Sequence, residues 1–347
     1  MPLDILIRGA GPVGCTLALL LRAQGKNVAL EKAPRRHPPA FRPLALSQAS
    51  RLILERVGAW RAATPIRSVH VSRQAAFGRT LMSAEDAGVE SLGYVAGYDV
   101  VLDALMERVA AASLPGDAPD AKLVVHAEGV SPEAGEKSYA QEALVALVTP
   151  ERTADGTAYE RFTPGGPLAL LPFAGRYAMV WGMPPDRARE LCGATDAEFL
   201  AALSAAFGRR AGKFTAVEQR SRAPLALRVR ASRIGERSAY IGNAAQTLHP
   251  VAGQGLNLGL RDAWDLARAL HDAVDPGDAQ VLRRFAASRR VDAFATVRVT
   301  DFLASGFTGA HPLPGLMRGI ALTALDTCLP ARRFFARRMI FGASALP

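Results

Sequence analysis

The first stretch of the chain alternates apolar runs with glycines in a pattern that predicts a strand, a helix and a second strand. Residues 4–8 form a short apolar run, residues 13–23 are apolar enough for a buried helix, and residues 28–31 form a second short run. Glycines stand where the first run passes into the helix, at Gly9, Gly11 and Gly14. This order predicts a βαβ unit.

The three glycines meet the demands of a turn that binds a pyrophosphate. Gly9 allows the sharp bend, Gly11 removes a side chain where phosphate approaches the backbone, and Gly14 lets the helix lie close to the strand. Free N–H groups at the helix start face the anion, and Glu31 ends the second strand where a ribose hydroxyl needs an acceptor. We therefore predict a dinucleotide site. A turn without a ligand is the alternative, and the triplet alone does not separate NAD from FAD.

The patterns that follow predict two more helices and a return to the main sheet. Residues 48–57 and 98–112 read as helices. Residues 123–127 form an apolar run typical of a buried parallel strand. Residues 66–93 are partly alternating, which predicts a hairpin or edge strands.

The middle of the chain predicts an antiparallel sheet. Between residues 138 and 183, alternating segments are separated by Gly and Pro. A helix is predicted over residues 196–207 and another alternating strand over residues 214–222. We interpret residues 138–229 as the main body of a second domain, whose sheet forms one wall of a substrate cavity.

The last third of the chain returns to the pattern of the beginning. A short strand at residues 239–242 leads into a loop rich in glycine and low in charge, and a helix follows over residues 254–273. The start of that helix is a second place where N–H groups meet a polar ligand. Residues 281–341 are mostly helical in pattern.

Composition limits the classes of partner. The chain has 347 residues, 49% of them hydrophobic, and a net charge of +10. Its basic residues are scattered along the chain and do not form long runs, and few aromatic residues stand between them. Nucleic acid is therefore not expected, whereas an anionic membrane surface, a negatively charged cofactor and an acidic partner all stay open.

The cysteines and the N-terminal residues predict a cytoplasmic protein without a metal site. The three cysteines, Cys15, Cys192 and Cys328, are far apart and lack metal-ligand spacing, and Cys15 is expected in the core. No secretion signal precedes the first strand, and the first helix is too short to span a bilayer.

Two separated motifs resemble those of the class A flavoprotein monooxygenases. They are GAGPVG at residues 9–14 and GNAAQTLHPVAGQGLN at residues 242–257. Within that class the chain looks most like the ubiquinone-biosynthesis hydroxylases of the UbiH group, which it also resembles in FTPGGPLALLP at residues 162–172, in Arg261-Asp262 and in Phe341-Gly342.

The resemblance implies an α/β fold. It would comprise a Rossmann-like FAD-binding domain, an inserted antiparallel-sheet substrate domain and a helical C-terminus. The boundaries we predict are residues 1–68, 93–137 and 230–312 for the FAD-binding domain, 69–92 and 138–229 for the substrate domain, and 313–347 for the C-terminal helical region.

The resemblance also implies which residues touch the ligands. FAD would contact Gly9, Gly11, Pro12, Val13, Gly14, Glu31, Lys32, Arg42, Gly242, Asn243, Gly253, Gly255, Leu256 and Asn257. Pro172, His249 and Pro250 would line the space between flavin and substrate. His249 could equally order the loop through a bond to the backbone, and no catalytic acid or base is assigned.

The implied activity is hydroxylation of an aromatic ring with NAD(P)H and O2 through a C4a-hydroperoxyflavin. The expected substrate is a polyprenylated phenol, and the tail at residues 332–341, which mixes arginine with large apolar residues, could rest on the inner face of a membrane or pack inward. A homo-oligomer or a place in a biosynthetic complex stays open, as do the ring position and the electron donor. A related halogenase or reductase is one alternative. A non-catalytic scaffold is another, because residues 115–135 are short and Glu128-Gly129 replaces the usual Asp-Gly.

Overall fold

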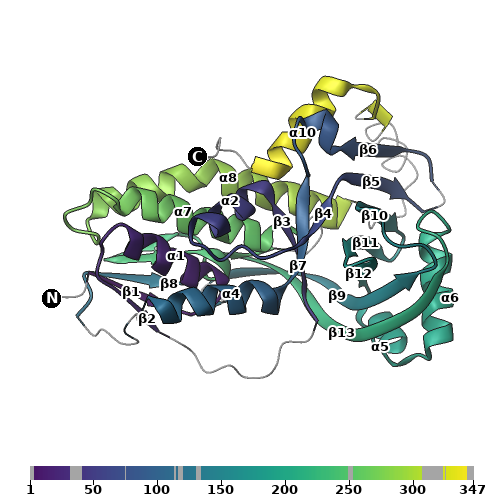
Figure 1. Cartoon of the computed structure of the whole chain (residues 1–347), viewed down its shortest axis with the longest axis horizontal. Helices are drawn as coiled ribbons and strands as arrows, with labels where there is room; N and C mark the ends of the chain where they lie inside the picture. The colour runs from purple at the N-terminus through teal and green to yellow at the C-terminus, as the bar shows by residue number, and fades with distance from the viewer. Residues whose placement is uncertain are drawn as a thin grey trace.

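The computed structural model describes residues 4–31, 41–74, 76–112, 115, 120–129, 134–248, 253–306, 323–324 and 326–341. Its elements form two lobes, one built on a parallel sheet with helices and one on a larger antiparallel sheet (Figure 1). Helices follow at the C-terminal end. The predicted α/β fold class is therefore confirmed.

The parallel sheet grows from the predicted βαβ unit. Its strand order is β14-β15-β8-β1-β2, and the strands are β1 (Ile5–Arg8), β2 (Val28–Glu31), β8 (Leu123–His126), β14 (Ile234–Gly235) and β15 (Ser238–Tyr240). β1 pairs in parallel with both β2 and β8, as expected for strands that are joined by crossover helices. The run at residues 123–127 thus returns to the main sheet, as predicted.

Helices cover this sheet and bury its apolar side chains. They are α1 (Pro12–Ala23), α2 (Gln48–Arg56), α4 (Tyr98–Ala111), α7 (Gln254–Leu270) and α8 (Ala279–Gly306). Ile5 and Ile7 of β1 are fully buried in one cluster with Leu17, Leu105 and Leu266 from three of these helices. Cys15 is also in this core. A small sheet of β3 (Pro43–Ser47), β7 (Gly93–Gly97) and β4 (Thr64–Ile66) lies between the lobes (Figure 1).

The antiparallel sheet forms the second lobe. Its order is β16-β13-β9-β12-β11-β10-β5-β6, with bounds β5 (Ser68–Arg73), β6 (Arg79–Ser83), β9 (Gly135–Pro150), β10 (Thr157–Thr163), β11 (Gly166–Phe173), β12 (Arg176–Met183), β13 (Phe214–Val229) and β16 (Gln246–Thr247). β5 and β6 are the predicted hairpin, and β6 is at the edge. β5 joins the sheet through a parallel pairing with β10.

Two helices cover the outer face of this sheet (Figure 1). α6 (Asp196–Phe207) has the predicted bounds, because Thr195 and Glu198 form a capping box at its start. α5 (Pro185–Gly193) was not predicted. Phe199 and Leu203 of α6 are fully buried against Leu168 and Leu170 of β11. Since side chains alternate along a strand, the other face of β11 is turned away from these helices.

β9 and β13 are the longest of the described strands and run side by side from the middle of the molecule into the second lobe (Figure 1). Their register shifts between Glu218 and Ser221 and again between Leu225 and Ala226. A third shift lies between Phe214 and Ala216. Non-glycine residues with positive φ occupy the first two, Gln219 at 55° and, on β9, Ala140 at 52°. These are β-bulges, which bend a strand locally.

The remaining described elements are short apart from one C-terminal helix. They are α3 (Ala84–Ala87), the 3-10 turn η1 (Gly242–Ala244) and α10 (Leu329–Phe341). Ala336 and Ile340 of α10 are buried against Ala87 of α3, whereas Phe334 is 72% exposed. The tail therefore packs one apolar edge inward and leaves Phe334 at the surface. Among the described residues, no helix is long and apolar enough to cross a membrane.

Candidate functional site

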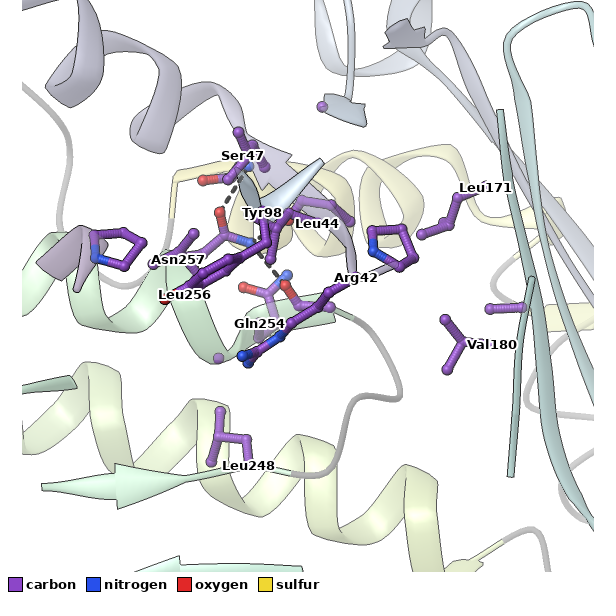
Figure 2. Close-up of a pocket in the computed structure, with 18 of the residues that line it drawn as sticks. Arg42, Leu44, Ser47, Tyr98, Leu171, Val180, Leu248, Gln254, Leu256 and Asn257 are labelled. Carbon is purple, nitrogen blue, oxygen red and sulfur yellow. Dashed lines mark hydrogen bonds between the residues drawn. The ribbon is translucent and has the colours of Figure 1, made fainter. Parts of the chain in front are cut away.

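A cavity of about 830 Å³ lies between the two sheets. One wall comes from the β1–α1 turn, β3, η1 and the start of α7, and the opposite wall comes from β5, β6, β10, β11 and β12. Figure 2 shows Gln254, Leu256 and Arg42 on the first side and Leu171 and Val180 on the strands across from them. The volume is within the usual range for a site that encloses an organic ligand.

The β1–α1 turn has the geometry of an anion site. Gly9 has a φ of 103°, and a Cβ there would be 2.5 Å from the backbone of Glu128. A Cβ at Gly14 would be 2.0 Å from the carbonyl oxygen of Gly9. Gly11 is the N-cap of α1 and offers no side-chain cap, Pro12 follows it, and the first turn has no acidic residue. The N-terminal amides of α1 can therefore receive an anion.

The late glycine turn is built in the same way at the start of α7. Gly253 is a left-handed N-cap with φ 59° and no capping side chain. A Cβ at Gly253 would be 2.8 Å from that of Ala45 in β3, so the turn is packed closely against this strand. The partial positive charge of the helix N-terminus then points into the cavity.

Asn257 holds this turn in place with its whole amide group. Its Oδ1 accepts from the N–H of Ser47 at 2.8 Å and from the hydroxyl of Ser50 at 2.7 Å. Its Nδ2 donates to the carbonyls of Ala45 at 2.8 Å and Gly253 at 2.9 Å. Figure 2 shows Asn257 bonded to Ser47 in this way. The side chain thus joins β3 and α2 to α7, and a ligand would meet the backbone of Asn257 rather than its amide.

The two glycine turns lie side by side. Val13 of α1 has its Cγ2 3.2 Å from the position of a Cβ at Gly242, and 2.7 Å from one at Gly259 in α7. Val13, Gly242 and the exposed Asn243 all line the cavity. Two motifs that are more than two hundred residues apart therefore meet at one wall, as a single extended cofactor requires.

Buried ion pairs hold the turn at Gly242, which begins η1, from behind. Asp262 of α7 is fully buried and accepts from the N–H of Gly242 at 3.1 Å and from Gln246 at 3.0 Å. Its other oxygen accepts from Arg289 of α8 at 2.7 Å. Burial alone would raise the pKa of Asp262, but the charges of Arg233 and Arg289 keep it below its ordinary value. The carboxylate is thus charged and fixes the turn.

Arg289 bonds three carboxylates at once. Its guanidinium donates to Asp262, and also to Asp265 and Asp292 at 2.8 Å each, and the residue is itself fully buried. Asp292 also accepts from Arg261 at 2.8 Å. We call Arg289, Asp262, Asp265, Asp292 and Arg261 the buried ion network.

Of the other residues expected to bind the cofactor, some line the cavity and others do not. Arg42 lines the cavity, and its guanidinium carbon lies over the ring of Tyr98, 5.0 Å from the ring centroid. Glu31 does not line it and is 3.4 Å from Arg8 on the neighbouring strand. Gly255 and Leu256 line it, and Gly14 acts through packing. Lys32, His249 and Pro250 lie outside the described residues.

Pro172 is the expected substrate residue that the structure does not bring to the cavity. On β11 the cavity is lined by Ala169 and Leu171, whereas Leu168 and Leu170 pack toward the helices. Pro172 follows the second pair because side chains alternate along the strand. Leu171 thus occupies the cavity face where Pro172 was expected.

The residues of the first wall fit FAD. Gly11 has ordinary helix-start dihedrals, with φ −76°, and a Cβ there would meet nothing closer than Tyr98 Oη at 4.0 Å. A Cβ at Gly255 would meet no described atom within 4 Å. The protein's own packing therefore does not require glycine at these positions. A ligand that contacts the backbone amides of α1 and α7 does require it, because a side chain there would occupy the ligand's space.

Comparison with known proteins agrees with this geometry. Residues 122–300 match the family described as FAD binding domain. The chain is 30% identical over 382 residues to ubiquinone hydroxylase UbiL of Rhodospirillum rubrum, covering 96% of this chain and 88% of that protein. The chain belongs to the FAD-dependent monooxygenases.

Other members resemble this monooxygenase over most of their length. It is 29% identical to 3-demethoxyubiquinol 3-hydroxylase of Escherichia coli, covering 94% of this chain and 95% of that one. Among solved structures, p-nitrophenol 4-monooxygenase PnpA of Pseudomonas putida superposes with a TM-score of 0.78 at 17% identity, covering 99% of both chains. HpxO of Klebsiella pneumoniae, solved with FAD and uric acid, superposes at 0.73 with 16% identity, covering 96% and 97%. These structures share the fold, and the match to the FAD binding domain makes FAD the cofactor, as predicted.

The second wall of the monooxygenase contains residues that sequence reasoning did not single out. Val69, Val71, Met82 and Val180 make it apolar, and Ala336 and Ile340 of α10 also line the cavity. Glu160 of β10 is in this wall, and burial raises the pKa of its carboxyl group to about 8. The signal in the sequence was that Glu160 shares a strand face with Ala158 and Phe162, where alternation calls for an apolar residue.

Glu128 is a second ionisable residue that borders the cofactor wall. It follows β8, lines the cavity and has its Oε1 2.8 Å from Nδ1 of His126. Burial would raise the pKa of Glu128, but the bond to His126 and backbone N–H groups keep it below the ordinary value.

Proposed function

We propose that the protein hydroxylates the aromatic ring of a polyprenylated phenol in ubiquinone biosynthesis, using NAD(P)H and O2. The observation that carries the proposal is the convergence of two uncapped glycine turns on one wall of a cavity whose other wall is an apolar sheet face. Relatives that are named as ubiquinone hydroxylases support this substrate class.

The chain's own residues bind the cofactor and exclude water. The amides of α1 and the turn at Gly11 would hold the pyrophosphate, with Arg42 along the cofactor. The N-terminus of α7 carries about half a positive charge and would stabilise negative charge on the reduced flavin ring. When bound, FAD accepts a hydride from NAD(P)H and activates O2 for transfer to an electron-rich ring. The apolar wall keeps water from the reacting atoms.

The apolar wall suits a ring with a hydrocarbon tail. Met82, Val69 and Leu171 present only apolar groups to the cavity, and burial of such a tail contributes about 0.8 kcal/mol for each CH2. We assign the first wall to FAD and the sheet to the substrate, in line with the predicted division of residues 69–92 and 138–229 from the rest.

We further propose that the protein rests on anionic lipid at the membrane. Phe77 is 63%, Leu81 48% and Phe334 72% exposed, and the exposed Arg79 and Arg333 lie beside them in the chain. Apolar side chains with interspersed cations are the combination that binds an anionic bilayer surface. Flotation with phosphatidylglycerol vesicles tests this, and equal recovery with neutral vesicles would remove the electrostatic part.

Reconstitution with FAD tests the main proposal. The purified protein should be yellow, bind FAD, and consume NAD(P)H faster when a prenylated phenol is added, with one oxygen atom of the product drawn from labelled O2. It should also restore quinone in a strain that lacks the hydroxylase. A colourless protein that takes up no FAD would instead be a scaffold, and a product without the labelled oxygen would indicate a halogenase or reductase.

A further inference from the structure

A straight row of side chains crosses the antiparallel sheet at the cavity, and one of them is a carboxyl group. Glu160 of β10 is in register with Val71 of β5 on one side and with Ala169 of β11 on the other. Beyond these, Val71 is opposite Thr80 and Ala169 is opposite Val180. Residues in register point to the same face of a sheet, and all five line the cavity. Glu160 is therefore at the centre of this row, with an apolar neighbour on each adjacent strand.

The carboxyl group has no partner in the described part of the protein. Oε1 of Glu160 is buried and accepts no hydrogen bond there. Two strands away, about 10 Å at the usual strand spacing, the buried hydroxyl of Thr80 also lacks a partner among those residues. A buried polar group without a partner costs free energy, and native proteins retain few of them. A ligand that supplies the missing hydrogen bond explains why Glu160 is kept in this wall.

The charged groups around Glu160 are directed elsewhere. Arg42 and Glu128 belong to the cofactor wall. On the strands beside Glu160, Arg79 is exposed, and Arg161 donates to the carbonyl of Ala206 at 3.0 Å toward the helices on the other face. Burial, rather than a neighbouring charge, sets the pKa of Glu160 above its ordinary value. Among the described residues, Glu160 thus faces the substrate space without a charged partner.

We propose that Glu160 hydrogen-bonds to a ring hydroxyl of the substrate and so fixes which edge of the ring faces the flavin. The proposal rests on the proposed function, because it takes the second wall as the substrate wall. It adds a specificity-determining contact: the ionised carboxylate accepts a hydrogen bond from the hydroxyl of a phenol, and not from the corresponding ether, which has no hydroxyl hydrogen to donate.

The contact also allows a proton to move without any other reactant. In its ionised form the carboxylate of Glu160 accepts the phenol proton, so that the phenol O–H bond breaks, a carboxyl O–H bond forms, and the electron pair stays on the phenolate oxygen. A phenolate ring is richer in electrons than a phenol ring and is attacked more readily at carbon. The raised pKa of the carboxyl group brings it closer to that of a phenol, which favours this transfer.

The test compares 2-prenylphenol with its methyl ether, 2-prenylanisole, as probes of the FAD-loaded protein. Glu160→Leu and Glu160→Gln are measured against wild type and against Glu218→Gln, which removes an exposed carboxylate from β13 of the same sheet. The readouts are the Kd of FAD, the Kd of each probe from the change in the flavin spectrum, and the pH dependence of phenol binding.

In Glu160→Leu we expect the Kd of the phenol to rise about 10- to 100-fold, the loss expected when a hydrogen bond to a charged or buried group is removed. At a pH above about 8, where the carboxylate of Glu160 is ionised and can only accept, the Kd values of FAD and of the ether should not change, and Glu218→Gln should behave as wild type. Glu160→Gln should fold even if the leucine variant does not, and its phenol binding should lose the pH dependence near 8.

Two results would overturn the inference. One is an equal loss of phenol and ether binding, because that indicates a packing role. The other is a phenol Kd that stays the same in both variants. If the wild type binds FAD and oxidises NAD(P)H with the phenol, either result concerns Glu160 alone, whereas a wild type that binds no FAD removes the proposed function itself.

Discussion

Replacing Arg289 with methionine should both destabilise the protein and loosen the turn at Gly242, which lines the cofactor wall. The side chain is fully buried and bonds Asp262, Asp265 and Asp292 at 2.7–2.8 Å. Its loss leaves Asp265 with only the exposed Arg268 at 3.4 Å as an ion-pair partner among the described residues. Removal of one partner from a buried ion pair costs about 3–5 kcal/mol, because the remaining charge is buried without compensation.

The same loss can be expressed as a melting temperature. Unfolding entropy is about 2.1 cal/mol/K for each residue, or roughly 0.7 kcal/mol/K for a chain of 347 residues. A loss of 3–5 kcal/mol therefore lowers the Tm by about 4–7 °C. Because Asp262 also accepts from the N–H of Gly242, the Kd of FAD should rise in the same variant.

Calorimetry and FAD titration on Arg289→Met check both expectations, and Arg268→Met is the matched control. Arg268 contacts the same Asp265, but its side chain is 65% exposed, and a surface pair of this kind contributes about 0–1 kcal/mol. Arg289→Lys should recover only part of the loss, because one ammonium cannot bond three carboxylates in the arginine geometry. If Arg289→Met melts at the same temperature as Arg268→Met, the buried ion network does not stabilise the fold. If it melts lower but binds FAD normally, the network is not coupled to the turn.

Three further predictions follow from the cavity. Gly11→Val should leave the Tm close to that of wild type, because a Cβ there meets nothing nearer than 4.0 Å, but should raise the Kd of FAD at least 10-fold; the matched Gly193→Val should change neither quantity. Asn257→Leu should cost about 3 kcal/mol in chemical denaturation, since it leaves several buried groups of β3 and α2 unpaired, and a cost below about 1 kcal/mol would contradict the role of its amide. For Glu160, the native pKa near 8 is above the ordinary 4.5, so the unfolded chain loses its proton first and stability falls as pH rises from about 4.5 to 8. Glu160→Gln should remove that fall, which is on the order of 5 kcal/mol for the whole pKa difference and smaller where cavity water reaches this half-buried residue; parallel pH profiles of the two proteins would refute it.

Local patterns were sufficient for the cofactor wall. The βαβ unit was predicted because its glycines stand where a strand must turn sharply into a helix that packs closely on it, and because apolar runs precede and follow them. α6 was predicted with its bounds because its start carries a capping box. α5 was missed because it buries only Ala188 and Leu191, which is too narrow an apolar stripe to stand out in a short segment.

The substrate wall depended on pairings that local patterns do not contain. β5 lies beside β10, although 89 residues separate Ser68 from Thr157 in their register. The sequence shows that Glu160 shares a face with Ala158, but only the sheet order tells which face is turned to the cavity. The role of Arg289 was hidden for a similar reason: it is one of several arginines in α8, and its three carboxylate partners come largely from another helix.

The long pair of β9 and β13 determines how the two lobes can move. A single linker would let the lobes swing freely, but two strands that are hydrogen-bonded along their length resist twisting and stretching alike. The points that bend most easily are the irregularities of this ladder, which include the bulges at Ala140 and Gln219. Any opening that admits substrate should therefore be a bend of this two-stranded ribbon at the bulges. Such a bend would change the distance between the two walls of the cavity and leave their relative orientation the same.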